Sequence, residues 1–207
     1  VYDAFSVADT VSSKDGGSIV GNVNFGGDLS SNTAGTSNFR AGVNAGNSIT
    51  SGGNYNVVIG DEAGTALTTG DDNVAIGFEA LSTEDTGTRA VAVGYRALKT
   101  QNNDSTNYNI AIGYDAGLSV TTGTQNVIIG GKAGDALTVG DDNVAIGRAA
   151  LTTDTQGSKS VAVGMNALAT QNFTSANDSY NTAVGYNDGT ATTTATNNTL
   201  IGGAAGD

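Results

Sequence analysis

The feature that most constrains this chain is a short phrase that recurs ten times. Each copy is five residues long and ends in glycine, as in NVVIG at Asn56–Gly60 and NVAIG at Asn73–Gly77. The closing glycines follow one another at sequence intervals of 18, 17, 17, 19, 17, 17, 17, 21 and 17. These glycines are Gly42, Gly60, Gly77, Gly94, Gly113, Gly130, Gly147, Gly164, Gly185 and Gly202. Because a unit this short cannot bury its own apolar residues, its copies must stack on one another.

A longer period lies above the short one. The sequence DDNVAIG at 71–77 returns at 141–147, and the surrounding segments 60–113 and 130–185 correspond along their length. We interpret this as the duplication of a block of four repeats. The chain divides accordingly into a repeat domain over 38–207 and an N-terminal segment over 1–37. The N-terminal segment lacks the phrase, and we expect it to be a cap or an attachment segment.

Within the phrase, apolar residues alternate by size. The residue before the glycine is Ile or Val in nine of ten copies, the residue three before it is Val or Ile in seven, and the residue between them is Ala in six. Side chains alternate along a strand, so the bulky pair shares one face and the small residue lies on the other. We predict an all-β fold, a parallel β-roll (β-solenoid) of about ten rungs, each with two short strands and two turns. Rungs of a parallel stack lie about 4.8 Å apart.

Two recurrent polar or flexible positions fit this fold. The closing glycine suits a corner that needs a positive φ or a close backbone approach. Asparagine stands four residues before the glycine in eight of ten copies, where its amide can bond to turn backbone and to the next asparagine along the axis. We expect this role for Asn56, Asn73, Asn109, Asn126 and Asn143.

The small residues at the centre of the phrase lead to a prediction about assembly. A thin roll buries little apolar area, and a row of alanines lets identical chains approach closely about a symmetry axis. We therefore predict a closed homo-oligomer, a homotrimer, formed through the alanine row. The alternative is that these alanines face the interior of a tight roll. They are Ala75, Ala92, Ala111, Ala145, Ala162 and Ala183.

Composition excludes several classes of function. The chain has no His and no Cys, which removes triad catalysis and zinc sites of the Cys/His kind. Its net charge of −12 argues against nucleic-acid binding, and its apolar runs are too short for a membrane helix. No dinucleotide-binding or phosphate-loop motif is present, so no cofactor is implied. Glu84/Asp85 and Asp154 are the nearest carboxylates to a glycosidase pair, but they lie in Thr-rich turns, and we expect no enzyme activity.

The repeats resemble those of two related kinds of fibrous protein. NVAIG followed by Ala three residues later, with TTG or TVG before the next Asn at 68–73 and 138–143, is similar to the head repeats of trimeric autotransporter adhesins. It is equally similar to the glycine-rich repeat shafts of bacteriophage tail fibres, which the 17-residue rungs favour. The resemblance implies a left-handed roll and a homotrimer. It covers about four fifths of the chain, residues 38–207.

The functional expectation is a structural and adhesive protein. The resemblance implies a trimeric segment of a phage tail fibre, in the virion and extracellular, with neighbouring fibre or tail proteins and a host glycan or protein receptor as partners. The alternative is the head of a bacterial adhesin at the cell surface. A third reading, an ice-binding solenoid, needs Thr-x-Thr pairs aligned in one array. The pairs at Thr86 and Thr122 start nine residues after the rung glycine, but those at Thr153 and Thr190 start six and five residues after it.

Two longer rungs mark candidate receptor loops, at 99–108 and 169–180, because loops on rigid scaffolds often carry function. The possible contact residues are Asn102, Asn103, Tyr108, Asn172, Phe173 and Tyr180. The tyrosines after the rung glycines, Tyr95, Tyr114 and Tyr186, are expected to pack at corners.

Acidic pairs occupy one turn position in both blocks. They are weak calcium candidates, although turn capping is the favoured role and no metal is predicted. The four residues are Asp71, Asp72, Asp141 and Asp142.

Overall fold

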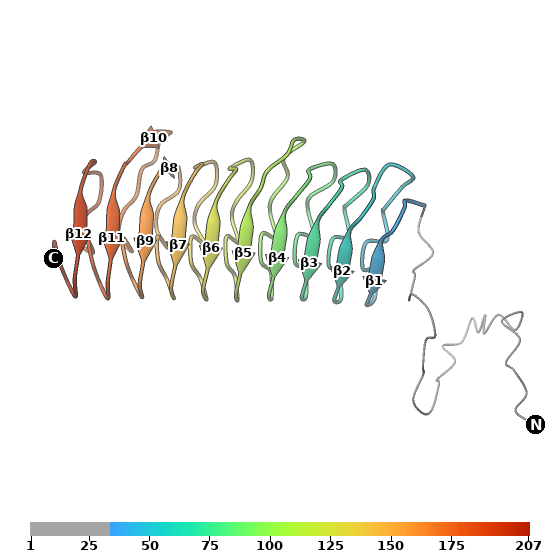
Figure 1. Ribbon diagram of the computed structural model, residues 1–207, viewed down its shortest axis with the longest axis horizontal. Helices are drawn as coiled ribbons and strands as arrows, with labels where there is room; N and C mark the ends of the chain where they lie inside the picture. Colours follow the sequence, from blue (N-terminus) through green and yellow to red (C-terminus); the bar gives the residue numbers. More distant parts are fainter. Residues whose placement is uncertain (1–33) are drawn as a thin grey trace, which may run out of the picture.

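The computed structural model of the protein describes residues 34–207 (Figure 1). The strands are β1 (Phe39–Ala41), β2 (Val57–Ile59), β3 (Val74–Ile76), β4 (Val91–Val93), β5 (Ile110–Ile112), β6 (Val127–Ile129), β7 (Val144–Ile146), β8 (Gly157–Ser158), β9 (Val161–Val163), β10 (Asn177–Asp178), β11 (Thr182–Val184) and β12 (Thr199–Ile201). Apart from residues 34–37, the N-terminal segment predicted to be a cap lies outside the described residues.

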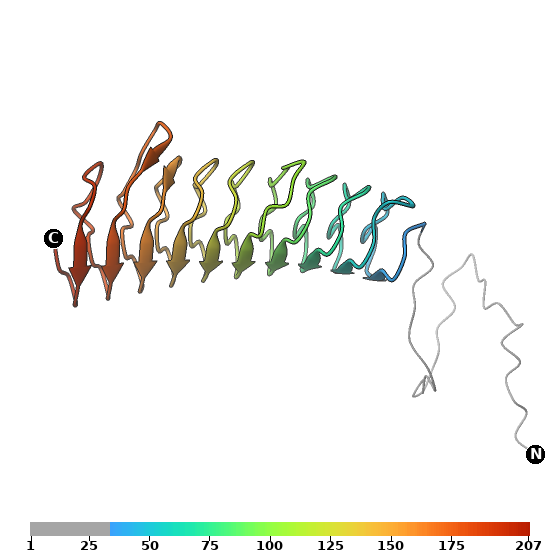
Figure 2. The same ribbon diagram turned by 45° about the horizontal axis from the view of Figure 1, so that its top comes forward.

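Ten strands form one parallel sheet that runs the length of the described chain. Their order is β1-β2-β3-β4-β5-β6-β7-β9-β11-β12, and equivalent phrase residues pair in register, as Val57 does with Val74 and Val74 with Val91. Figures 1 and 2 show these strands stacked side by side along the long axis. The predicted all-β solenoid of about ten rungs is confirmed.

Each rung contributes one strand to the main sheet, and among residues 34–207 the ordinary rungs other than the one that contains β8 have no second strand, although their length predicted two. The return side consists of turns, because residues two and four positions after each rung glycine have left-handed backbone, as in Glu62 at φ 57° and Gly64 at φ 51°. These turns still bond to the next rung, with Gly64 N donating to Ala80 O at 2.9 Å and Thr68 N to Asp85 O at 2.7 Å. The rungs are therefore joined around much of their circumference and not at the sheet alone.

The two longer rungs rise above their neighbours in Figure 1. Their extra residues enlarge the turns opposite the main sheet and leave the sheet register intact. At the second one, β8 and β10 form a separate two-stranded parallel pair. At the first, Thr88 and Thr106 make a single parallel bridge. The insertions are thus carried on the scaffold without disturbing it.

The closing glycines form a column at one corner. All ten have φ between +128° and +150°, a region that L side chains rarely adopt. They also approach one another closely, since a Cβ on Gly77 would lie 2.4 Å from the carbonyl oxygen of Gly94. Both reasons for glycine, backbone conformation and close contact, apply at the same position.

The asparagines form a buried ladder beside the strands. The Oδ1 of Asn56 accepts from the backbone N of Asn73 at 2.9 Å, and the Nδ2 of Asn73 donates to the Gly87 carbonyl at 2.9 Å. The same pattern joins Asn109, Asn126 and Asn143 in the second half of the rod. Each amide satisfies backbone groups of the following rung, which are costly to leave unpaired inside the protein.

The alanine row faces the interior of the roll, which corrects the prediction that it forms the surface of association. The six central alanines are fully buried within the single chain, as are Val58 and Ile128 at the same position in their strands. The bulky residues on either side point outward and remain partly exposed. Because leucines from the turns and the asparagine ladder are also buried inside the roll, each strand places its single central residue inward and its two flanking residues outward.

Turn residues complete the core. Two turn positions, four and seven residues after the rung glycine, fill the same space, so at most one of them carries a large apolar side chain in a given rung. Four rungs place a buried leucine four residues after the glycine, and in these rungs the residue at position seven is polar. These leucines are Leu81, Leu98, Leu151 and Leu168. Four other rungs have glycine at position four and an apolar residue at position seven, as in Gly64 with Leu67 and Gly134 with Leu137. A Cβ on Gly64 would meet Leu67 Cδ1 at 2.9 Å, so the two positions compete for one space.

Candidate interaction surfaces

The outer side of the main sheet is a continuous apolar surface. In β2 to β7 and in β9, both outward positions of every strand are Val or Ile, and we call this surface the Val/Ile face. Within the single chain these side chains are partly exposed, reaching 39% for Ile112. A contiguous exposed apolar strip is typical of an interaction site.

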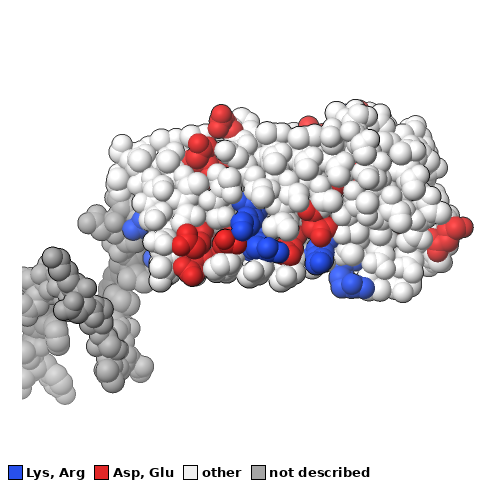
Figure 3. All heavy atoms as spheres, turned by 180° about the vertical axis from the view of Figure 1, so that it is seen from behind, with Lys and Arg blue, Asp and Glu red and all other residues white. Residues whose placement is uncertain are grey.

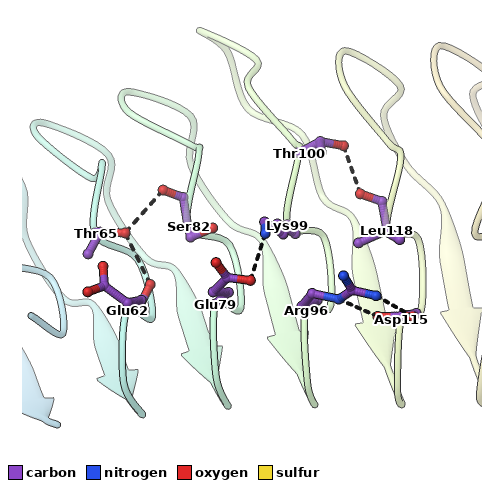
Figure 4. Close-up of polar contacts among 9 residues, drawn as sticks. All are labelled: Glu62, Thr65, Glu79, Ser82, Arg96, Lys99, Thr100, Asp115 and Leu118. Atoms are coloured by element: carbon purple, nitrogen blue, oxygen red, sulfur yellow. Dashed lines mark hydrogen bonds and ion pairs between the residues drawn. The ribbon is translucent and has the colours of Figure 1, made fainter. Parts of the chain in front are cut away.

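Figure 3 shows many of the charged side chains of residues 34–207 in a band along part of the rod. Much of the remaining surface in this view carries no charged side chain. Arg96 donates to both carboxylate oxygens of Asp115 at 2.8 Å, and the Lys99 ammonium lies 2.6 Å from the Glu79 carboxylate. Figure 4 shows both pairs joining neighbouring rungs. Nearby Thr65 and Thr100 donate to the carbonyl oxygens of Ser82 and Leu118 in the following rungs. These contacts link neighbouring rungs.

Each extended loop ends in an exposed tyrosine beside a cation of the preceding rung. The Arg89 guanidinium lies 5.8 Å from the ring centre of Tyr108, and the Lys159 ammonium lies 5.4 Å from that of Tyr180. Lys159 is also 2.6 Å from Asp178, a contact that lowers the pKa of Asp178 and raises the pKa of Lys159. Each cation is attracted to the ring face, and both tyrosines remain exposed.

Other loop residues named from the sequence differ in accessibility. Asn102 is exposed, while Asn103 and Asn172 are half-buried. Phe173, expected at a loop tip, is only 6% exposed and lies beside the preceding rung, where a Cβ on Gly157 would meet its ring at 2.9 Å. Phe173 is therefore a packing residue and is not presented to a receptor.

The bases of both loops are anchored by buried carboxylates. Glu84 accepts from Gln101 Nε2 at 3.0 Å and from the backbone N of Gly87 and of Asn103. Burial raises its pKa, and these hydrogen bonds act in the opposite direction. The second block repeats the arrangement at the equivalent position: Asp154 accepts from Gln171 at 2.6 Å and from the backbone N of Gly157 and of Phe173.

This burial argues against Glu84 and Asp154 as a glycosidase pair, whereas the third candidate, Asp85, is only half-buried. Glu84 and Asp154 are both fully buried, so neither can reach a substrate as the rung stands. They also lie four rungs apart, roughly 19 Å at the spacing of a parallel stack. A retaining or inverting pair needs about 5 to 10 Å between its carboxyl groups.

The acidic pairs proposed as weak calcium ligands act in turns. Asp71 accepts from the backbone N of Asn54 at 2.6 Å, and Asp141 accepts from Thr124 N at the same distance. Asp72 and Asp142 have left-handed backbone, and Asp72 lies 3.6 Å from Arg89. Within residues 34–207, no three acidic side chains are grouped so that they could hold a metal ion.

The residues directly after the rung glycines include an aromatic stack. Phe78, Tyr95 and Tyr114 come from successive rungs, with ring centres 5.4 and 5.2 Å apart and planes within 15°. The sequence reasoning named the two tyrosines as corner residues but missed Phe78. The signal was available, because all three residues directly follow a rung glycine.

Comparisons with protein-family models, with curated proteins and with solved structures return no match to this chain. In the part of the chain that the structure describes, there is no helix of the length and apolarity needed to cross a bilayer.

Proposed function

We propose that this protein is a non-catalytic structural and adhesive protein: a segment of an extracellular fibre in which three copies associate along the Val/Ile face. The observation that carries the proposal is that face. The Val/Ile face extends from rung to rung, and no other segment of residues 34–207 packs over it. Burying its remaining exposed area in a parallel bundle of rods stabilises every rung in proportion to the apolar area removed from water.

The rest of the surface fits a spacing and presenting role. The extended loops at 99–108 and 169–180 stand on a scaffold whose rungs are joined by ladders of backbone and asparagine bonds. Exposed Asn102, Tyr108 and Tyr180 are the loop residues offered to a host-surface receptor. A phage tail fibre is the assembly that we favour, in line with the 17-residue rungs, and a left-handed roll belongs to the same proposal.

The native mass in solution tests the association. Light scattering after size exclusion is expected to give three times the single-chain mass of 20.4 kDa. Ile112→Asp places a charge on the Val/Ile face and is expected to yield monomers. Val139→Asp is the matched control, because Val139 is 37% exposed, close to the 39% of Ile112, but lies in a turn away from the main sheet. A monomeric wild type, or equal masses for both variants, would contradict the proposal.

A further inference from the structure

The aromatic stack stops at a glycine, and the gap is a cavity. One face of Tyr114 is covered by Tyr95, while the next rung has Gly131 in the stacking position. A Cβ built on Gly131 has nothing within 4 Å. The cavity, of about 270 Å³, is lined by Tyr114, Gly131, Lys132, Arg148 and Ala149. Its volume lies just below the range of about 300–1,000 Å³ of small-molecule sites, which fits one ring-sized group.

The spacing of the rungs gives the gap the depth of one ring. Tyr114 and Arg148 belong to rungs two apart, roughly 10 Å along the stack. The rings already present are separated by 5.2 and 5.4 Å. A ring placed over Gly131 would therefore lie at stacking distance from Tyr114 on one side and against Arg148 on the other.

The charges at the gap are positive and unpaired. The ion pairs among residues 34–207 involve Arg89, Arg96, Lys99 and Lys159, and neither Lys132 nor Arg148 takes part in one. The neighbouring carboxylate, Asp115, has both oxygens bound by Arg96. Among the described residues, the only side-chain hydrogen bond of the Arg148 guanidinium goes to the Met165 sulfur, at 3.4 Å, and a thioether is a weak acceptor. Both cations are available to a ligand in a chain whose net charge is −12.

We propose that this cavity binds one carboxylated sugar residue of an acidic polysaccharide, with its apolar face on Tyr114 and its carboxylate on Arg148 and Lys132. Arginine matches the planar carboxylate with two parallel hydrogen bonds. This protein is acidic and repels anionic polymers. A polysaccharide with one carboxylate per repeating unit is repelled far less than a nucleic acid with its closely spaced phosphates. This proposal specifies the class of ligand for the attachment role, and it therefore rests on the proposed function.

The sharpest test fills the gap and removes no lining side chain. Gly131→Tyr continues a stack that the chain already builds in three rungs. Gly203→Tyr is the matched control, since Gly203 holds the same rung position in the last repeat and a Cβ there also has nothing within 4 Å. Methyl glycosides of glucuronate, galacturonate and N-acetylneuraminate serve as probes, with binding followed by saturation-transfer NMR and calorimetry.

At least one acidic probe is expected to bind wild type and Gly203→Tyr equally, and to lose at least tenfold in affinity for Gly131→Tyr. Its methyl ester is expected to bind about tenfold more weakly than the acid, and the double variant Lys132→Met/Arg148→Met to abolish that difference. Circular dichroism checks that each variant folds.

Binding of no acidic probe, or equal binding by Gly131→Tyr, would overturn the assignment. A lower native mass for Gly131→Tyr would also overturn it, by assigning the cavity to contact between copies. A wild type that has the trimeric mass but binds no acidic probe overturns this site and leaves the fibre proposal standing, so the two failures are distinguishable.

Discussion

At the scale of single residues, this protein uses each recurrent residue for a local contact with the next rung. The corner glycines accept a φ that other residues avoid and leave room for the following carbonyl. The asparagines satisfy backbone groups of the following rung. The departures from the repeat are equally informative, because buried Glu84 and Asp154 occur where the next rung carries an extended loop.

Glu84 gives a prediction about pH. Burial raises its pKa above the ordinary 4.5, so the folded chain binds the proton more tightly than the unfolded chain. Its contribution to stability is therefore present at acid pH and is lost as the pH rises through the folded-state pKa. Each tenfold gain in proton affinity on folding corresponds to about 1.4 kcal/mol.

Thermal melts of wild type and Glu84→Gln between pH 4 and pH 8 measure this contribution, because the variant does not titrate at position 84. The melting temperature of wild type relative to the variant is expected to fall as the pH rises. A relative melting temperature that rises with pH would show that the hydrogen bonds from Gln101, Gly87 and Asn103 outweigh burial.

At the scale of the rung, packing follows a rule of shared volume. Where the position four residues after the glycine is leucine, the strand centre is alanine, as in Ala92 with Leu98. Where that position is glycine, the strand centre can be large, and a Cβ on Gly134 would lie 3.4 Å from Ile128. The strand and the turn of each rung thus contribute to one core volume.

This rule predicts unequal effects for one substitution at two equivalent sites. Ala92→Ile adds volume beside Leu98 and is expected to lower the free energy of unfolding by about 1–3 kcal/mol, the usual cost of overpacking. Ala111→Ile is expected to cost less, because its rung has Gly117 in place of leucine. Urea denaturation of both variants measures the difference, and equal losses would refute the rule.

At the scale of the whole molecule, stability is close to a sum over rungs and their interfaces, as in other repeat proteins. The duplicated block is a whole number of rungs, so its removal preserves the register of the sheet. Deleting residues 78–147 joins Gly77 directly to Arg148 with the rung sequence intact.

This deletion variant is expected to remain folded with a lower melting temperature, as followed by circular dichroism. Deleting residues 78–138 stops within a rung, and that variant is expected to lose the cooperative transition because strands no longer align with strands. A cooperative transition in both deletions would contradict the description of the rungs as register-bound units.

The sequence by itself determined the rung period, the place of every strand in the main sheet and the columns of glycine and asparagine. All of these features are local and recur in each repeat, so the same backbone requirement can be recognised in ten copies of the phrase. The sequence also predicted that Ala75 lies on the opposite face of its strand from Val74 and Ile76, because successive side chains of a strand point to opposite faces.

Which of these faces lies inside was decided only by the tertiary structure. Alternation is the same whichever face is buried, and the choice depends on how much room the turn leucines and asparagines leave within the roll. The same closure of the rung buried Glu84 and Phe173, which the polar composition of their loops had placed in solvent. It also aligned Tyr114, Gly131 and Arg148 along one corner, because rungs stacked in register bring equivalent positions of successive repeats into contact.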